Sequence, residues 1–265
     1  MIGLNTDSNT SLLQQIQQRQ NERLEQLASG RRINSAADGA AAQQIIDRLT
    51  SQVEGNRQSI SNAYDGVSLA QVAEGGLSGI TEDVNRIREL TIQAGNGLLN
   101  DSDRSAIQQE ISQLQDNISQ TVEQTTFAGQ PLLSEEGSIS FQVGANAGQQ
   151  INVNTQDIGS QLSDVLNIDV TSQSVDDALA AADAAIETVG AARGELGATQ
   201  NQFESRARSL SQADVNVTAA RSRIADTDFA QATSELAAAN VLNQSSIAVQ
   251  AQSNQQQGAV LSLLS

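Results

Sequence analysis

The sequence predicts a mainly α fold, an elongated and discontinuous helical bundle or coiled coil with one small β-hairpin region. Three observations predict this class. Apolar residues recur at helical spacing through residues 42–125 and at every seventh position through 175–224. Aromatic residues make up only 2% of the chain, so the large side chains of an ordinary globular core are scarce. Between the helical segments lie two short stretches whose apolar residues alternate with polar ones.

Residues 42–126 are predicted to form a helical hairpin. The first helix has a seam of apolar or small residues with one polar member, and a disturbance of the pattern is expected at Gly75–Gly76. The seam residues are Ile46, Leu49, Val53, Asn56, Ile60, Ala63, Val67, Ala70, Leu77, Ile80, Val84, Ile87 and Ala94. Asn56 either fixes the register of the seam or is a tolerated polar position.

The return helix of this hairpin is predicted after residues 95–97, Gly-Asn-Gly, which end the first helix. Residues 101–103, Asp-Ser-Asp, supply the candidates for its N-cap. Its apolar residues step by three and four, and they are Ile107, Ile111, Leu114, Ile118 and Val122.

Residues 127–174 are predicted to be a β-hairpin region. Ile139, Phe141 and Val143 alternate with polar residues, residues 144–148 form a turn, and the alternation returns at 151–153. Residues 155–174 are expected to be an irregular connection.

A long helix is predicted over residues 175–224, with Ser174 as its N-cap and Asp177 three residues further on. One row of its seam is apolar without interruption and the second row is mixed, which suits a helix with one flank in solvent. The apolar row is Ala182, Val189, Leu196, Phe203, Leu210, Val217 and Ile224.

The two ends of the chain are predicted to be helices with weak seams. The N-terminal seam is Leu13, Ile16, Gln20, Leu24 and Leu27, and the C-terminal seam is Leu236, Ala239, Asn243, Ile247, Gln250, Gln257, Leu261 and Leu264. Such seams are expected to order only when many copies pack together. We therefore expect a discontinuous terminal domain, residues 1–40 and 226–265, and a rod domain, residues 41–225, in which 42–126 is the helical hairpin, 127–174 the β-hairpin region and 175–224 the long helix.

The composition excludes most catalytic functions. The chain has no His and no Cys, which removes Ser-His-Asp and Cys-His catalysis and ordinary zinc sites. We therefore expect no enzyme, and no catalytic, cofactor-binding or metal-binding residues. The formal net charge of −17 argues against a nucleic-acid partner. No cleaved secretory signal and no run of 18 apolar residues is found, so membrane insertion is not expected.

Several motifs, in order along the chain, carry a resemblance to a known family. The stretch LASGRRINSAADGAA at 27–41 resembles the N-terminal signature of bacterial flagellin, and SRIADTDF at 222–229 and VLSLL at 260–264 are similar to its C-terminal signature. Shorter matches lie at 85–94, 127–129 and 141–146. The sequence resembles a minimal flagellin, which lacks the variable outer domains.

The resemblance implies a structural function. A flagellin is exported unfolded by the flagellar type III apparatus and assembles under a cap into the hollow, extracellular filament that bacteria rotate to swim. The terminal helices would line its channel. The implied partners are identical subunits, the flagellar cap, junction proteins, the export apparatus and an export chaperone at the C-terminal helix. Two alternatives stay open, a hook–filament junction protein and a secreted coiled-coil effector or adhesin.

Two sets of site residues follow from the resemblance and from spacing. Arg86, Leu90 and Glu110 match the patch by which the innate immune receptor TLR5 recognises some flagellins, and Arg86 and Leu90 share a helix face. The alternative is that Leu90 packs in a subunit interface and Arg86 and Glu110 form a surface ion pair.

The second set is the pair of candidate elbows between the terminal and rod segments. Arg31, Arg32 and Asp38 form one elbow, either as a hinge with ion pairs or as solvated turn charges. Asp226 and Asp228 lie at the opposite elbow, where an N-cap is expected.

Overall fold

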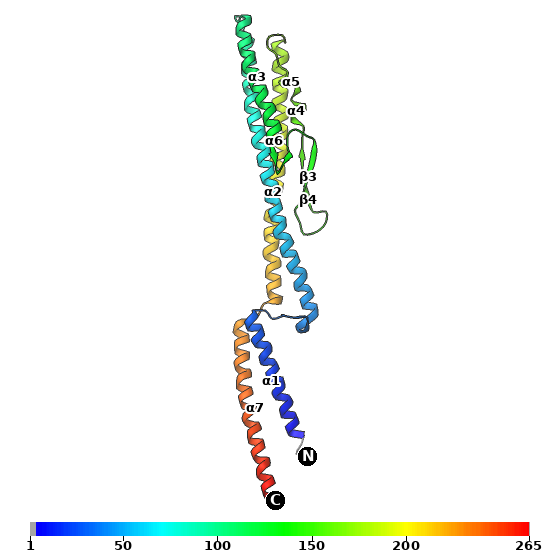
Figure 1. Ribbon diagram of the computed structural model, residues 1–265, viewed down its shortest axis with the longest axis vertical. Coiled ribbons are helices and arrows are strands. Elements are labelled where there is room, and N and C mark those ends of the chain that lie inside the picture. Colours follow the sequence, from blue (N-terminus) through cyan, green and yellow to red (C-terminus); the bar gives the residue numbers. More distant parts are fainter. Residues whose placement is uncertain (1–3, 265) are drawn as a thin grey trace. The chain divides into compact units, whose positions relative to one another are not determined.

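The computed structural model describes the backbone of residues 4–264 and the side chains of residues 11–256 and 259. The chain divides into two compact units. Unit 1 comprises Met1–Val53 with Val215–Ser265, and unit 2 comprises Glu54–Asp214. Long helices dominate both, and the four described β-strands lie in unit 2, which confirms the mainly α prediction (Figure 1).

Helix α2, Ala36–Ala94, supplies the first predicted seam. It is kinked near its start, at Gly39, and then runs through Gly75 and Gly76 without a break, so the expected disturbance is absent. Close packing requires a glycine at position 76, because a Cβ atom there would lie 2.6 Å from Thr125 Oγ1 and 3.1 Å from a methyl group of Leu133. The prediction that the helix ends before residues 95–97 is confirmed.

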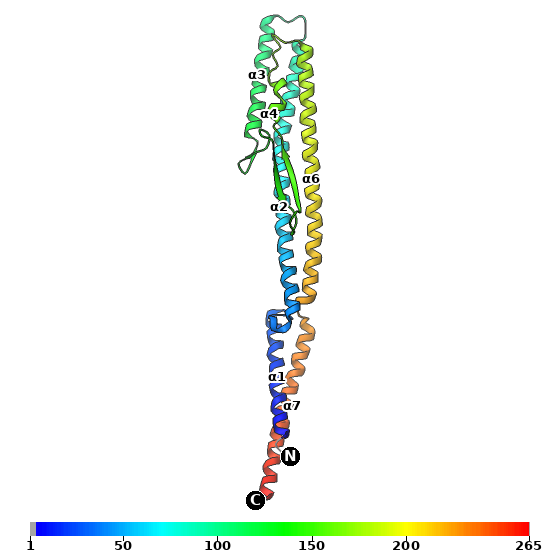
Figure 2. The same ribbon diagram turned by 90° about the vertical axis from the view of Figure 1, so that its right-hand side faces the viewer.

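Helix α3, Asp101–Gln124, returns beside α2 (Figure 2). Its N-cap is Asn100 rather than a residue of 101–103. The Asn100 side chain accepts the N–H of Asp103, and the Asp103 carboxylate accepts the N–H of Asn100 in return, which is a complete capping box. Four of the five predicted apolar residues of this helix are buried and Leu114 is partly buried.

Helix α6, Val175–Ala225, carries the seven-residue apolar row. The first five members, from Ala182 to Leu210, are buried, with Phe203 fully enclosed. Asn56, on the facing part of α2, is only 4% exposed. The core of unit 2 therefore lies along the helix seams, as the periodicity predicts.

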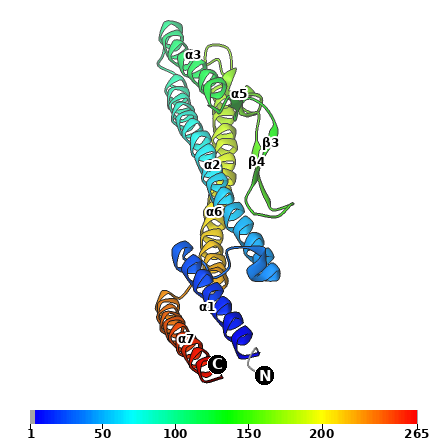
Figure 3. The same cartoon turned by 60° about the horizontal axis from the view of Figure 1, so that its bottom comes forward.

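Two antiparallel hairpins complete the β structure of unit 2. Strand β1, Thr126–Phe127, pairs with β2, Gln130–Pro131, and β3, Gly137–Gln142, pairs with β4, Gln150–Thr155. The register of the larger hairpin sets Ile139 opposite Val153 and Phe141 opposite Ile151. It is bonded to both long helices of unit 2 (Figure 3): Asn62 of α2 donates to the Gln142 carbonyl, Arg206 of α6 donates to the Val143 carbonyl, and Glu195 of α6 accepts from Asn154.

The segment expected to be irregular, 155–174, contains two short helices, α4, Ile158–Gln161, and α5, Ser163–Leu166. These helices and the residues beside them bury an apolar set against α3 and the rest of the core. This set is Ile158, Leu162, Val165, Ile168 and Val170. Each helix has a single turn, which is too short to establish a helical period in the sequence.

Unit 1 is built around α1, Leu4–Ser29, and α7, Phe229–Leu264, which lie side by side. The predicted seams are partly corrected. Leu24 and Ile247 were expected to face inward, but they are 52% and 55% exposed, and Arg23 and Ser246 occupy the inward positions. Leu261, Leu264 and Gln257 lie outside the described side chains. No helix in the described part of the chain contains an apolar stretch sufficient to cross a membrane.

Candidate functional site

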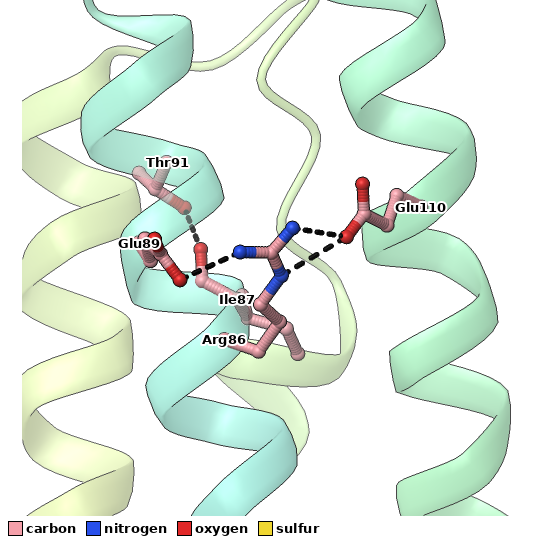
Figure 4. Close-up of polar contacts among 5 residues, drawn as sticks. All are labelled: Arg86, Ile87, Glu89, Thr91 and Glu110. Carbon is pink, nitrogen blue, oxygen red and sulfur yellow. Dashed lines mark hydrogen bonds and ion pairs between the residues drawn. The ribbon is translucent and has the colours of Figure 1, made fainter.

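The candidate receptor patch centres on Arg86 of α2. Its guanidinium donates from Nε and Nη2 to the Oε1 atom of Glu110 on α3, at 3.0 and 2.7 Å, and from Nη1 to Glu89 at 2.7 Å (Figure 4). The predicted contact between the two helices is therefore present. Arg86 links α2 to α3 by a charged side chain held by two carboxylates.

The electrostatics of this cluster are those of a solvated surface site. Hydrogen bonds to Glu110 and then Glu89 raise the pKa of Arg86, and a guanidinium is positively charged at any physiological pH. The side chains of Arg86 and Glu110 are 44% and 48% exposed, and pairs this open to water contribute at most about 1 kcal/mol to stability. The cluster therefore offers a charged recognition surface rather than a strong contribution to stability.

Leu90 does not lie on this surface. It is 2% exposed and belongs to the core of unit 2, so the expectation of a shared accessible face with Arg86 is corrected. Residues four apart on a helix differ by about 40° around its axis. That rotation is enough to place Arg86 at the edge between α2 and α3 and Leu90 inside it.

The elbow residues of the N-terminal segment are held mainly by backbone pairing. Arg31 and Asp226 form an isolated antiparallel bridge, and the Arg32 N–H donates to the Ala225 carbonyl at 2.6 Å. The Arg32 guanidinium donates to the Ile224 carbonyl at 2.8 Å. None of the ion pairs among the described side chains involves Arg31, Arg32, Asp38, Asp226 or Asp228. The hypothesis of a hinge set by ion pairs is therefore not supported by these contacts.

The aspartates of both elbows act as local hydrogen-bond acceptors. The Asp38 carboxylate accepts the N–H groups of Ser35 and Asn34, at 2.8 and 2.9 Å, just before α2 begins. Asp226 accepts the Ser222 hydroxyl. Asp228 accepts the N–H of Ala230 at 2.9 Å and caps the start of α7, as expected for an N-cap.

Asp38 gives a testable pH dependence. Backbone hydrogen bonds from Ser35 and then Asn34 lower the pKa of Asp38 below its ordinary value of 3.8. Because the folded pKa is below the unfolded one, the carboxylate stabilises the start of α2 above about pH 4, and this contribution is lost as pH falls through the folded pKa. NMR titration of the Asp38 carboxyl carbon should give a midpoint below 3.8. The stability difference from Asp38→Asn should shrink in acid, and a midpoint at or above 3.8 would contradict the assignment.

Among the described residues, no cluster of three or more His, Cys, Asp or Glu side chains is arranged to hold a metal ion. Sequence reasoning missed the polar contacts of unit 1, and one of them lies between α1 and α7. Gln20 of α1 bonds to Asn240 and Asn243 of α7 through both ends of its amide. Gln20 and Asn243 were noted only as polar seam positions, and that is the one signal that could have revealed the contact.

Comparison with known proteins assigns the chain. Residues 4–138 match the bacterial flagellin N-terminal helical region, and residues 179–264 match the bacterial flagellin C-terminal helical region. A flagellin of Bacillus subtilis is 38% identical, with 91% of each chain covered. A flagellar filament 30.7 kDa core protein of Treponema maltophilum is 36% identical over all of this chain and 95% of its own.

Solved structures support the same fold. A Bacillus cereus flagellin crystal structure matches with a TM-score of 0.51 at 23% identity, covering 57% of this chain and 88% of its own. A protein assigned to the flagellar hook-associated proteins of Vibrio parahaemolyticus matches with a TM-score of 0.62 at 18% identity, covering 71% and 100%. At these identities the likeness concerns the fold alone. From the two family regions and the full-length relatives, the chain belongs to the bacterial flagellin family and is a structural subunit of the flagellar filament.

Proposed function

We propose that this subunit is exported unfolded by the flagellar type III apparatus and polymerises outside the cell into a hollow helical tube for swimming. In this proposal residues 1–40 and 226–265 form the terminal domain that lines the channel, and residues 41–225 form the rod domain around it. The observation that carries the proposal is that both terminal helical regions of the family match in one chain. No disulfide can hinder an unfolded passage, because the chain has no Cys.

The terminal helices support assembly through their exposed apolar side chains. Apolar residues of α1 and α7 that are 46–64% exposed are Leu12, Leu24, Phe229, Val241, Leu242, Ile247 and Val249. Seven large apolar side chains open to water on one helix pair favour burial by further copies. A tube is a heterologous, non-closing assembly, so each copy needs two complementary surfaces.

The further partners belong to the same proposal. These partners are a cap at the growing end, junction proteins at the base, the export apparatus and a chaperone bound to the C-terminal helix. Each of them requires terminal helices that are accessible rather than buried in the subunit's own core. The weak, partly polar seams of α1 and α7 are consistent with such accessible helices.

Electron microscopy of purified chain under polymerising conditions tests the main proposal. Long tubes formed without other components support it and separate it from a hook–filament junction protein. Limited proteolysis separates it from a secreted effector or adhesin. Both termini should be trimmed in the monomer and protected in the polymer, whereas an effector would have stable ends throughout. Short rods or globules alone would overturn the proposal.

Assembly should depend strongly on salt. Unit 2 contains 7 of the 14 Arg and 23 of the 31 acidic residues, a formal net charge of −16, so neighbouring copies repel. The Debye length falls from about 30 Å at 10 mM salt to about 10 Å at 100 mM. We expect the critical concentration for polymerisation, measured by sedimentation, to be at least about tenfold higher at the lower salt.

A matched variant checks the cause of this salt effect. Removing two exposed charges with Glu135→Gln and Glu136→Gln should shift polymerisation to lower salt. A critical concentration that does not change between the two salt conditions would show that repulsion does not limit assembly.

We also propose that released monomer is an agonist of TLR5, with Arg86 and Glu110 as the contact residues and Leu90 supporting them from the core. The support is a permanently charged, half-exposed guanidinium held in a fixed position.

Arg86→Ala should reduce receptor activation by the monomer at least about tenfold, which is the loss typical of an arginine at a binding hot spot. It should lower the free energy of unfolding by less than about 1 kcal/mol, because both ion pairs are exposed. The matched control is Arg88→Ala, which removes a similarly exposed pair with Asp183 and should leave activation unchanged. Reporter cells bearing the receptor give the readout, and equal activity of wild type and Arg86→Ala would reject the assignment.

A further inference from the structure

The α7 side of its contact with α1 is mostly polar or small, whereas Leu13, Ile16 and Leu27 of α1 are buried or partly buried. The inward positions of α7 step by three and four, and they are Ala232, Leu236, Ala239, Asn243, Ser246, Gln250 and Ser253. Only one of these is a large apolar residue, whereas Val241, Leu242 and Ile247 are at least 50% exposed. Because α7 supplies only one large apolar residue to this contact, hydrophobic packing against α1 does not by itself select which turn of α7 faces which turn of α1.

A single amide interaction occupies the middle of this contact. Gln20 Nε2 donates to Asn240 Oδ1 at 2.7 Å, and Gln20 Oε1 accepts from Asn243 Nδ2 at 2.9 Å. Asn240 and Asn243 are three residues apart, so they lie on one face of α7 and hold the glutamine amide between them. One turn away, Arg23 and Glu235 form an ion pair at 2.7 Å.

Other registers would lose these bonds. A shift of seven residues preserves the spacing of the seam, but it brings Gln20 opposite Thr233 and Leu236 in one direction, or Ile247 and Gln250 in the other. In each case a large apolar residue replaces an asparagine. Gln20 and Asn243 are half-buried and Asn240 is exposed, so this alignment is favoured by the two direct hydrogen bonds that it alone allows.

We propose that Gln20, Asn240 and Asn243 form an amide clamp that sets the register of α1 against α7 in every subunit. The inference rests on the proposed function, because a fixed register has its effect in the assembled filament. Identical copies pack into a regular tube only if each presents the same outward surface. A fixed offset between the two helices keeps the outward apolar residues of α1 and α7 in the same relative positions from copy to copy.

Pulsed electron paramagnetic resonance measures the register directly. Because the chain has no Cys, Glu25→Cys and Gln252→Cys place two nitroxide labels on exposed positions, several turns apart along the pair. Labelled chain is diluted into filaments of unlabelled chain, so that only distances within one subunit are measured. The wild-type background should give one distance. Gln20→Leu should add a second population displaced by about 10 Å, the rise of seven helical residues.

Two variants serve as controls. Gln17→Leu changes an exposed glutamine on the same helix and should keep the single distance. The exchange Gln20→Asn with Asn243→Gln keeps amides in the layer and should restore it. If the Gln20→Leu chain is not incorporated into filaments, the double variant decides. Incorporation of the chain with Gln20→Asn and Asn243→Gln would support the clamp, and its exclusion from filaments would overturn the clamp.

The possible failures are distinguishable. Absence of filaments from wild-type chain would overturn the proposed function. A Gln20→Leu distance distribution identical to that of Gln17→Leu, in filaments that form normally, would overturn the clamp and leave the proposed function intact.

Discussion

Replacing Phe203 with Ala is expected to lower the free energy of unfolding of unit 2 by about 3–5 kcal/mol. Phe203 is 0% exposed and is the largest fully buried side chain among the described residues. Its ring meets that of Phe141 edge-to-face, with centroids 5.4 Å apart and planes at 87°. With four Phe, one Tyr and no Trp in the chain, few other large side chains are available to fill the space.

Thermal and urea unfolding of the monomer, followed by circular dichroism at 222 nm, measures this effect. The matched control is Phe229→Ala in unit 1. Phe229 is 55% exposed, so its removal should change stability by no more than about 0.5 kcal/mol. A loss below about 1 kcal/mol for Phe203→Ala would show that the Phe203 site collapses freely and is not the centre of the core.

The second large effect is expected from Gly66→Ala, which should destabilise unit 2 by about 1–3 kcal/mol. Alanine normally stabilises a helix by about 1 kcal/mol relative to glycine. At Gly66, however, the added methyl group would lie within 2.8 Å of three atoms of the Phe203 ring. The clash with a packed aromatic ring outweighs the gain in helix propensity.

The same substitution elsewhere on α2 should have the opposite sign. Gly75 and Gly79 have open space where a Cβ would be placed, so Gly75→Ala and Gly79→Ala should each raise stability by about 0.5–1 kcal/mol. Combining Gly66→Ala with Phe203→Leu should cost less than the sum of the two, because the smaller side chain relieves the clash. If all three glycine substitutions stabilised the monomer, the proposed packing of Gly66 against Phe203 would be wrong.

The glycines illustrate what sequence reasoning could and could not reach. Gly66, Gly75 and Gly76 look alike in the sequence, where the expectation was a disturbance of the seam at Gly75–Gly76. Gly66 and Gly76 are needed because a ring and a threonine from distant parts of the chain approach them, whereas Gly75 has no such neighbour. The approach of a distant side chain leaves no local pattern.

The terminal helices show a second limit. Their period was correct, but in α1 the inward residue is Arg23 and not Leu24, because the partner helix presents Glu235 there. From hydrophobicity alone, Leu24 was expected to face α7. The ion pair with Glu235 instead turns Arg23 toward α7, and Leu24 is left on the outer surface, where further copies can cover it.

The candidate site was predicted in part for the same reason. The family resemblance singled out Arg86 and Glu110, the predicted hairpin brought them within reach of each other, and their contact is present at 2.7 Å. The burial of Leu90 was not predictable, because it depends on how α2 is rotated against α3 and α6.

Residue types and their local spacing were sufficient to predict the family, the helical seams, the larger β-hairpin and the absence of thiol and histidine chemistry. The tertiary structure alone decided the core position of Leu90, the backbone pairing of Arg31 and Arg32 with residues 225–226, and the bonding of Gln20 to α7. A periodic pattern fixes which face of a helix is turned inward. Only the packed structure fixes which residue stands opposite, because that depends on the offset and rotation between elements far apart in the chain.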